Sequence, residues 1–337
     1  MQTANKQVLI MALLHKINSK ATSQINTGFG INNADYGGRF VNKDGYPNVE
    51  KRGINYFERI SWYHVMLQMP RWKFLGIIFS FYILVNLFFA CIYYIIGIEH
   101  LEGIVAHTFS EKFGEAYFFS AQTFTTVGYG RISPKGITTS TIAAFEALVG
   151  LLSFAIATGL FYGRFSKPKA YIRFSENAVL APFNNGLAIM MRIAPYKNNS
   201  LLEVEAKVTA GIIIEEDGLP KNKFFLLDLE YEKVNSLNLS WTLVHPITDK
   251  SPFYKFTAAD FANTSGEILI FVKAFDDMFS NTVVARSSYT LQELVIGAKF
   301  VPMYHRNKDN ETTILELDKL NSHAEADISK LWVTEKK

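Results

Sequence analysis

The sequence predicts a two-span α-helical membrane domain followed by an all-β sandwich. Three observations support this. Residues 74–98 carry no charge, and a second apolar stretch, residues 138–165, carries a single acid, Glu146. After Pro168, short runs rich in β-branched and aromatic residues alternate with turn-forming residues, which is typical of a β-sandwich. The chain of 337 residues is 49% hydrophobic but only 19% charged, fewer charges than ordinary soluble domains carry.

Composition excludes several classes of function. The net charge of +3 is too small to suggest a nucleic-acid partner. The one cysteine, Cys91, cannot form an intrachain disulfide. The β-rich part has no nucleophile elbow, phosphate loop or metal-ligand spacing. We therefore expect neither an enzyme nor a cofactor.

Both apolar stretches are long enough to cross a bilayer. At about 1.5 Å per residue, residues 74–98 would extend about 37 Å. The alternative is a buried core helix, but such helices are rarely so long and apolar on every side. Basic residues cluster at the outer ends of the two spans, so both termini should be cytoplasmic. The ones nearest the spans are Arg71, Lys73, Arg164, Lys167 and Lys169.

These five basic residues are also candidates for binding anionic lipid headgroups. Plain positive-inside anchoring explains them equally well. Before them, residues 57–70 mix bulky apolar side chains with Arg59 and His64 and end at Pro70. This mixture predicts a helix lying in the membrane interface. The alternative is a short soluble helix packed on the C-terminal domain.

We therefore divide the chain into four parts. They are an N-terminal cytoplasmic arm at 1–56, the interfacial helix at 57–70, a transmembrane domain at 71–168 and a cytoplasmic β-sandwich at 169–337. Between the two spans, residues 113–125 predict a helix too short to cross the membrane, which would enter and stop.

The five residues 126–130, Thr-Val-Gly-Tyr-Gly, follow that short helix directly. Irregular backbone at membrane depth is tolerated only where it is buried in protein or lines a water-filled cavity. Pointing successive carbonyls one way requires alternating right- and left-handed backbone angles, and Gly128 and Gly130 adopt the left-handed ones at little cost. Thr126 can add its hydroxyl, while Val127 and Tyr129 can pack outward. The segment is therefore suited to coordinating a dehydrated cation.

The pentapeptide resembles the selectivity filter of potassium channels, with K⁺ held by Thr126, Val127, Gly128 and Tyr129, and with Gly130 completing the filter. One such strand supplies one side of a ring, and the motif occurs once. Four chains must then assemble around one axis as a homotetramer. The short helix at 113–125 would be the re-entrant pore helix.

The rest of the chain resembles the inward-rectifier potassium channel family over nearly its whole length. RFVNKDGYPNV at 39–49 looks like the family's N-terminal motif, and residues 57–70 match its slide helix. FSENAVLAPFNNGLAIMMRI, SPFYKFTAADF and VVARSSY are similar to its cytoplasmic immunoglobulin-like domain. Paired extracellular cysteines are missing around the filter, which favours the bacterial branch.

The resemblance implies a gate at Tyr162, where the second span crosses its neighbours. Phe154, Thr158 and Tyr162 are four residues apart and share a helix face, so they can line the pore, although a lipid-facing or packing stripe would have the same spacing. Gly150 and Gly159 can let the helix bend, and close helix packing explains them equally well.

In the cytoplasmic domain, the resemblance implies one further constriction of the pore and one acidic site. Ala274 to Asn281, including Asp276 and Asp277, matches a loop that narrows the cytoplasmic pore. Glu205 matches an acid that attracts cations into the vestibule. The family also implies gating by this domain and modulation by anionic lipids.

Three residues depart from the family's usual pattern. Gln122 replaces an acid in the pore helix, so an ion pair behind the filter would be lost. Phe154 replaces the acid of strong rectifiers, so block by polyamines or Mg²⁺ should be weak. Arg131 follows the filter where many potassium channels have Asp, and should oppose cation entry unless an acid neutralises it. The candidate acids are Glu99, Glu102 and Glu115.

Glu146 is expected to lie behind the filter, paired, as a supporting residue rather than a pore-lining one. The resulting hypothesis is a tetrameric K⁺ channel of the cell membrane, multi-pass and of the bacterial inner membrane, with K⁺ as the permeant ion. The alternative is a membrane-anchored sensor whose pore conducts weakly or not at all.

Overall fold

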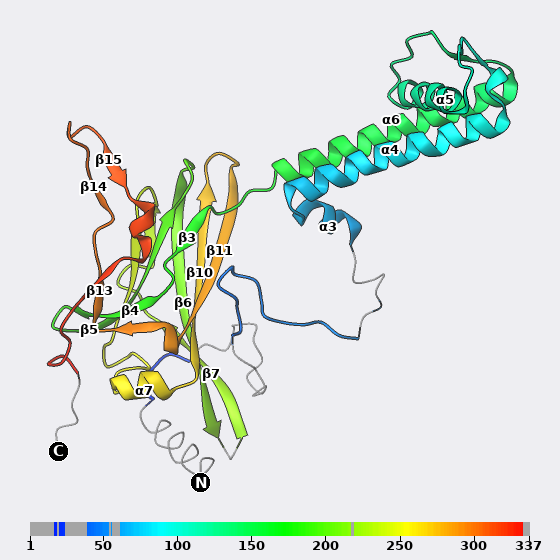
Figure 1. Ribbon diagram of the computed structural model, residues 1–337. Helices are drawn as coiled ribbons and strands as arrows, with labels where there is room; N and C mark the ends of the chain where they lie inside the picture. The colour runs from blue at the N-terminus through cyan, green and yellow to red at the C-terminus, as the bar shows by residue number, and fades with distance from the viewer. Residues whose placement is uncertain are drawn as a thin grey trace. The chain divides into compact units, whose positions relative to one another are not determined.

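The computed structural model describes residues 17–18, 20–23, 39–53, 55, 61–216 and 219–332. The chain divides into two compact units (Figure 1). One unit contains residues 51–167. The other contains residues 168–337 together with residues 1–50, so the described arm residues up to residue 50 belong with the β-rich domain, whereas residues 51–53 and 55 belong to the helical unit. Each unit is described by itself.

The described residues of the helical unit form two long helices and two short ones. Helix α3 spans Trp62–Gln68, α4 spans Arg71–Ile96, α5 spans Phe109–Phe124 and α6 spans Ile137–Phe165. Helix α5 packs against α4 and α6 at one end of this pair, and α3 contacts α6 at the other end (Figure 1). A two-stranded ribbon of β1 (Leu101–Glu102) and β2 (Ser133–Pro134) joins the segments on either side of α5.

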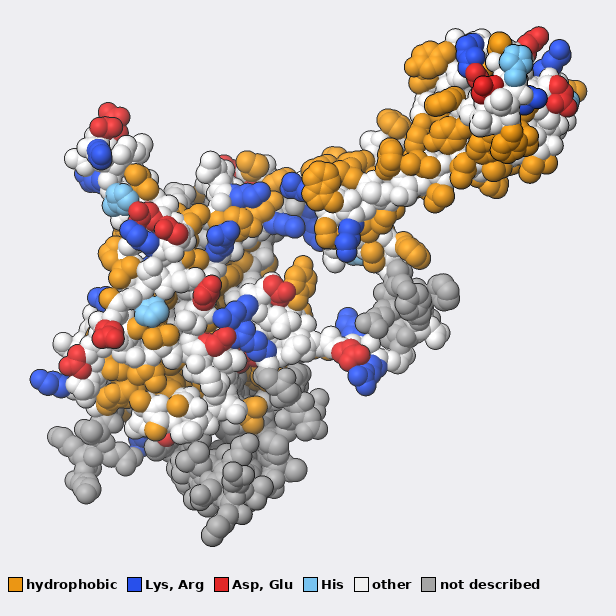
Figure 2. Space-filling model, in the orientation of Figure 1, with side chains coloured by type: hydrophobic (Ala, Val, Ile, Leu, Met, Phe, Trp, Pro, Cys, Tyr) orange, Lys and Arg blue, Asp and Glu red, His pale blue; other side chains and the backbone are white. Residues whose placement is uncertain are grey.

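Helices α4 and α6 are long and apolar enough to cross a membrane. At about 1.5 Å per residue they extend about 39 Å and about 43 Å. Pro70 precedes α4 and Gly97 caps its end, so the helix begins three residues before the expected range and stops two residues short of its end. Figure 2 shows hydrophobic side chains covering much of the visible face of this pair.

Helix α5 begins four residues earlier than expected, because Thr108 and Glu111 form a capping box. The Thr108 hydroxyl accepts from the Glu111 backbone N–H, and the Glu111 carboxylate accepts from the Thr108 N–H. This arrangement satisfies amide groups that a helix start otherwise leaves unpaired. Of the expected interfacial helix at 57–70, the structure describes α3; residues 57–60 lie outside the described residues.

The β-rich unit is a sandwich of two five-stranded sheets. One sheet has the order β11-β10-β6-β7, with β8 also paired to β6, and the other has the order β12-β4-β5-β3, with β9 also paired to β5. The strands of the first sheet are β6 (Leu201–Glu216), β7 (Leu219–Leu227), β8 (Lys233–Ser236), β10 (Gly266–Asp276) and β11 (Asn281–Thr290). Those of the second are β3 (Ile172–Phe174), β4 (Ala178–Phe183), β5 (Gly186–Pro195), β9 (Trp241–Pro246) and β12 (Leu294–Ile296).

Smaller elements complete the two units. In the helical unit a 3₁₀ turn, η1, follows α4. Among its described residues, the β-rich unit adds one helix, two 3₁₀ turns and two ribbons. The turn in the helical unit is η1 (Ile98–His100). The elements of the β-rich unit are α7 (Ala258–Asn263), η2 (Leu291–Glu293), η3 (Leu317–Asn321), β13 (Ala298–Phe300) paired with β16 (His323–Glu325), and β14 (Tyr304–Arg306) paired with β15 (Thr313–Leu315).

The main core of the sandwich lies between inward-facing aliphatic residues of the two sheets, such as Ile189, Val208 and Ile270. The described N-terminal residues dock on this body. The buried Glu267 carboxylate accepts from the backbone N–H groups of Phe40 (2.5 Å) and Val41 (3.3 Å). Burial raises the pKa of Glu267, against the opposing effect of these hydrogen bonds.

Candidate functional site

The segment 126–130 has the alternating backbone that its sequence led us to expect. Gly128 and Gly130 have φ of 53° and 79°, and Thr126 has φ of 58°. Val127 and Tyr129 are not among the residues with positive φ. Nothing lies within 4 Å of where a Cβ would sit on either glycine, so the backbone angle, rather than crowding, requires glycine there. Thr126 adopts an angle that costs a non-glycine residue energy.

Gln122 braces this segment from the end of α5. Its backbone carbonyl accepts from the N–H groups of Val127 (2.9 Å) and Gly128 (3.3 Å). Its side-chain Oε1 accepts from the Tyr129 N–H at 3.1 Å. The sequence predicts that an ion pair behind the filter is lost here, because Gln122 replaces the acid usual in the family. The structure adds that the neutral amide supports the filter backbone directly.

Glu146 is fully buried where α4, α5 and α6 meet. Its Oε2 accepts from the Tyr93 hydroxyl at 2.6 Å, and its Oε1 contacts the Ser120 hydroxyl. Ser120 in turn contacts Asn86 at 3.1 Å. Among the described residues, Glu146 has no ion-pair partner, so its expected pairing is with hydroxyl groups. The sequence reasoning missed Tyr93, Ser120 and Asn86, although an asparagine inside an apolar span is a signal.

Arg131 forms an ion pair with Glu115. Glu115 lies on α5, and its side chain is 22% exposed, whereas that of Arg131 is 57% exposed. Of the three acids that the sequence offered, Glu115 is therefore the partner in this structure. The ion pair ties the residue after the filter back to the helix before it.

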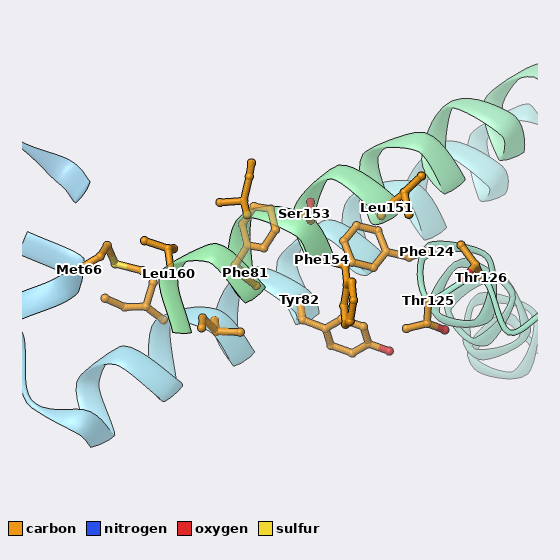
Figure 3. A pocket seen from close by; sticks show the side chains of 15 residues that line it. Met66, Phe81, Tyr82, Phe124, Thr125, Thr126, Leu151, Ser153, Phe154 and Leu160 are labelled. Carbon is orange, nitrogen blue, oxygen red and sulfur yellow. The ribbon is translucent and has the colours of Figure 1, made fainter. Parts of the chain in front are cut away.

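A cavity of about 760 Å³ lies beside the filter, between α4, α5 and α6. It is lined mostly by apolar side chains, with Thr125 and Thr126 at one end and Met66 at the other (Figure 3). Phe154 and Tyr82 both line its middle. A single chain thus exposes an apolar surface that continues directly into the filter segment.

The expected pore stripe lies on the exposed surface of α6. Phe154 is 73% exposed and Tyr162 is 75% exposed, and Thr158 between them is exposed as well. The Thr158 hydroxyl donates to the Phe154 carbonyl at 2.8 Å. Its oxygen therefore remains free to accept a hydrogen bond from water.

The two candidate hinge glycines of α6 have different surroundings. A Cβ on Gly150 would lie 1.9 Å from the Phe124 carbonyl oxygen, whereas nothing lies within 4 Å of one on Gly159. Gly150 therefore permits close contact between α6 and the end of α5, which favours the packing explanation over the hinge at that position. No such contact explains Gly159, so the proposal that α6 bends at this residue stays a prediction.

Arg164 is engaged within the helical unit. Its guanidinium donates to the carbonyls of Met66 (3.1 Å) and Met69 (2.5 Å), and lies 5.0 Å from the centre of the Phe74 ring. It satisfies carbonyls at the end of α3, and these contacts hold its guanidinium within the helical unit, while its assignment to a lipid headgroup stays a prediction. Four other basic residues are exposed: Arg71, Lys73, Lys167 and Lys169.

Two of the expected cytoplasmic pore residues are buried. Asp276 is fully buried and accepts from the Asn199 side chain (3.1 Å) and the Phe279 N–H (3.2 Å). Ala274 is 2% exposed. Asp276 thus satisfies groups at the β10–β11 hairpin in a single chain, and its place in a cytoplasmic pore stays a prediction. Asp277 is exposed, and Glu205 is 3.4 Å from Lys207.

Two membrane-length helices, a short helix between them and an alternating backbone segment define the class of this protein as an ion channel. Residues 72–167 match the family model described as "Ion channel". Residues 172–337 match "Inward rectifier potassium channel C-terminal domain". The chain belongs to the inward rectifier potassium channel family, which is a channel family rather than an enzyme family.

Curated relatives match along most of their length. Inward rectifier potassium channel Kirbac3.1 of Paramagnetospirillum magnetotacticum is 30% identical over 292 residues, which cover 85% of this chain and 96% of the relative. G protein-activated inward rectifier potassium channel 2 of Pongo abelii is 27% identical, covering 86% and 78%. ATP-sensitive inward rectifier potassium channel 12 of Bos taurus is 27% identical, covering 80% and 68%.

Proposed function

We propose that four copies of this chain form a K⁺-selective pore in which residues 126–130 surround one axis. The observation that carries the proposal is the alternation of positive φ at Thr126, Gly128 and Gly130. This backbone is suited to aiming successive carbonyls in one direction, as a ring of ion ligands requires. The segment is exposed in a single chain, which leaves room for three further copies.

The apolar cavity supports the same assembly. It opens beside Thr126 and is lined by Leu151 and Phe154 of α6. In a tetramer, the helices of a second copy would cover such a surface. Helix α5 would act as the re-entrant pore helix, because its 16 residues reach only about 24 Å, less than the ~30 Å hydrocarbon core.

The gate is proposed at Tyr162, with Phe154 and Thr158 lining the pore between gate and filter. Four tyrosines brought together at this level would narrow the pore when α6 is straight. Bending at Gly159 would widen it. The β-rich domain would drive that movement, since it follows α6 directly along the chain.

The orientation follows from the exposed basic residues. Arg71 and Lys73 begin α4, and Lys167 and Lys169 follow α6, so we place both termini in the cytoplasm. The similarity to Kirbac3.1 of Paramagnetospirillum magnetotacticum supports placing the protein in a bacterial inner membrane. Anionic lipids would bind these four residues and shift the gating equilibrium. Rectification would be weak because Phe154 carries no charge, with Glu205 and Asp277 as the remaining cytoplasmic acids.

The test is cation uptake by liposomes that contain the purified full-length protein. We expect Rb⁺ and K⁺ to enter far faster than Na⁺, with block by Ba²⁺. Tyr162→Ala should raise the uptake measured under conditions that close the wild-type channel. Equal Na⁺ uptake would contradict selectivity. Unchanged closed-state uptake by Tyr162→Ala would contradict the gate assignment alone.

A further inference from the structure

A chain of buried polar contacts connects α4, α5 and α6 behind the filter. Tyr93, Ser120, Asn86 and Glu146 are each at most 1% exposed. The contacts run from Tyr93 to Glu146, from Glu146 to Ser120, and from Ser120 to Asn86. Each contact between two of these buried polar atoms needs one hydrogen that one atom donates and the other accepts, because a buried polar group without a hydrogen bond is costly.

The orientation of the Asn86 amide is the starting point for counting these protons. Its Nδ2 donates to the Tyr82 carbonyl at 2.7 Å. A carbonyl can only accept, so this bond places the amide nitrogen on the Tyr82 side. The Oδ1 atom therefore faces Ser120, and Oδ1 can only accept.

Ser120 must then supply the proton between itself and Asn86. A serine hydroxyl has a single hydrogen and two lone pairs. If that hydrogen points to Asn86 Oδ1 at 3.1 Å, none remains for Glu146 Oε1. The Ser120–Glu146 contact needs its own hydrogen, and of the two groups in this contact Glu146 is the one left to provide it. The Tyr93 hydroxyl donates to the other oxygen, Oε2.

An ionised Glu146 does not fit this arrangement. Ser120 would have to donate to it, which would leave two bare oxygens facing each other at the Ser120–Asn86 contact. Flipping the Asn86 amide moves the same conflict to Tyr82. In the described part of the chain, no Lys, Arg or His forms an ion pair with Glu146, and Tyr93 is its one titratable hydrogen-bond partner. A lone buried carboxylate is strongly disfavoured.

We propose that Glu146 is a neutral carboxylic acid that donates its proton to Ser120, and that it acts as a positioning residue for the pore helix. Ser120 precedes Gln122 by two residues on α5, and Gln122 holds the Tyr129 N–H. The hydrogen bond from Glu146 to Ser120 thereby holds the C-terminal end of α5, from which Gln122 supports the filter backbone. The consequence for selectivity rests on the proposed function, whereas the protonation state stands on the hydrogen-bond geometry alone.

The first test uses two variants of Glu146 in liposome flux assays. Glu146→Gln preserves the pattern, since its amide N–H can donate to Ser120 and its oxygen can accept from Tyr93. We expect its K⁺/Na⁺ flux ratio to equal that of the wild type. Glu146→Asp is shorter and cannot reach both partners, so its ratio should fall about tenfold, as for the loss of one buried hydrogen bond. A Gln variant that loses selectivity as severely as Asp would overturn the proposal.

The second test is spectroscopic and does not depend on conduction. The infrared difference between wild type and Glu146→Gln at neutral pH should show the carbonyl stretch of a protonated carboxylic acid. If Glu146→Gln does not fold, Ser120→Ala serves instead, because the acid then loses its acceptor and its band should shift. Absence of the band, or no response to Ser120→Ala, would overturn the proposal. A non-selective pore with the band present would refute the proposed function alone.

Discussion

Replacing Gly150 with alanine tests whether contact between α6 and the end of α5 holds the filter in place. The added Cβ would lie 1.9 Å from the Phe124 oxygen, 2.8 Å from its carbonyl carbon and 3.1 Å from its Cα. All three are backbone atoms, so no side-chain rotation relieves the clash. The two helices must separate, and Phe124 lies two residues before the filter.

The size of the effect follows from two opposing terms. Overpacking of this kind costs about 1–3 kcal/mol. Alanine in place of glycine in a helix returns about 1 kcal/mol. We therefore expect Gly150→Ala to lower stability by up to about 2 kcal/mol and to reduce K⁺/Na⁺ selectivity, because the displaced α5 no longer positions Gln122.

Gly159→Ala is the matched control, since nothing lies within 4 Å of its added Cβ. It should keep or raise stability, and it should lower the open probability if α6 bends there. Thermal unfolding of the detergent-solubilised protein and liposome flux measure the two effects. If Gly150→Ala proved as stable and selective as Gly159→Ala, the packing argument would be refuted.

Three further predictions concern the filter surroundings and the β-rich domain. Glu115→Gln should lower K⁺ flux severalfold at low salt by exposing the charge of Arg131, and Arg131→Gln added to it should restore the flux; a double variant as slow as the single one would contradict the pairing. Gln122→Ala should reduce selectivity more than Gln122→Glu, which retains an acceptor for Tyr129; equal flux ratios would exclude the brace. Burial lowers the pKa of His245, so the unfolded state takes up more protons and the melting temperature should fall as the pH drops below about 6.5, less so in His245→Gln; parallel pH profiles would contradict this.

The long elements could be predicted from the sequence because length and patterning determine them. A 25-residue uncharged run has few alternatives to a spanning helix. The glycines at 128 and 130 likewise indicated a backbone with alternating handedness before any coordinates. Thr126 joins that alternation, which residue type alone does not indicate, because threonine rarely adopts a positive φ.

Side-chain partners were harder to predict, because sequence distance does not determine them. Glu99, Glu102 and Glu115 were equally plausible partners for Arg131, and only the packing of α5 selects Glu115. Asp276 was assigned to a pore because its neighbours resemble a pore loop. In a single chain its position in β10 turns it inward, where Asn199 and the Phe279 N–H satisfy it, a contact that the resemblance does not indicate.

The account depends most directly on the selectivity of residues 126–130. A planar bilayer containing the full-length protein, with K⁺ on one side and Na⁺ on the other, measures this property through the reversal potential. The account predicts a large potential of the sign that opposes K⁺ movement, close to that of an ideal K⁺ electrode. A reversal potential near zero in a conducting bilayer would contradict it.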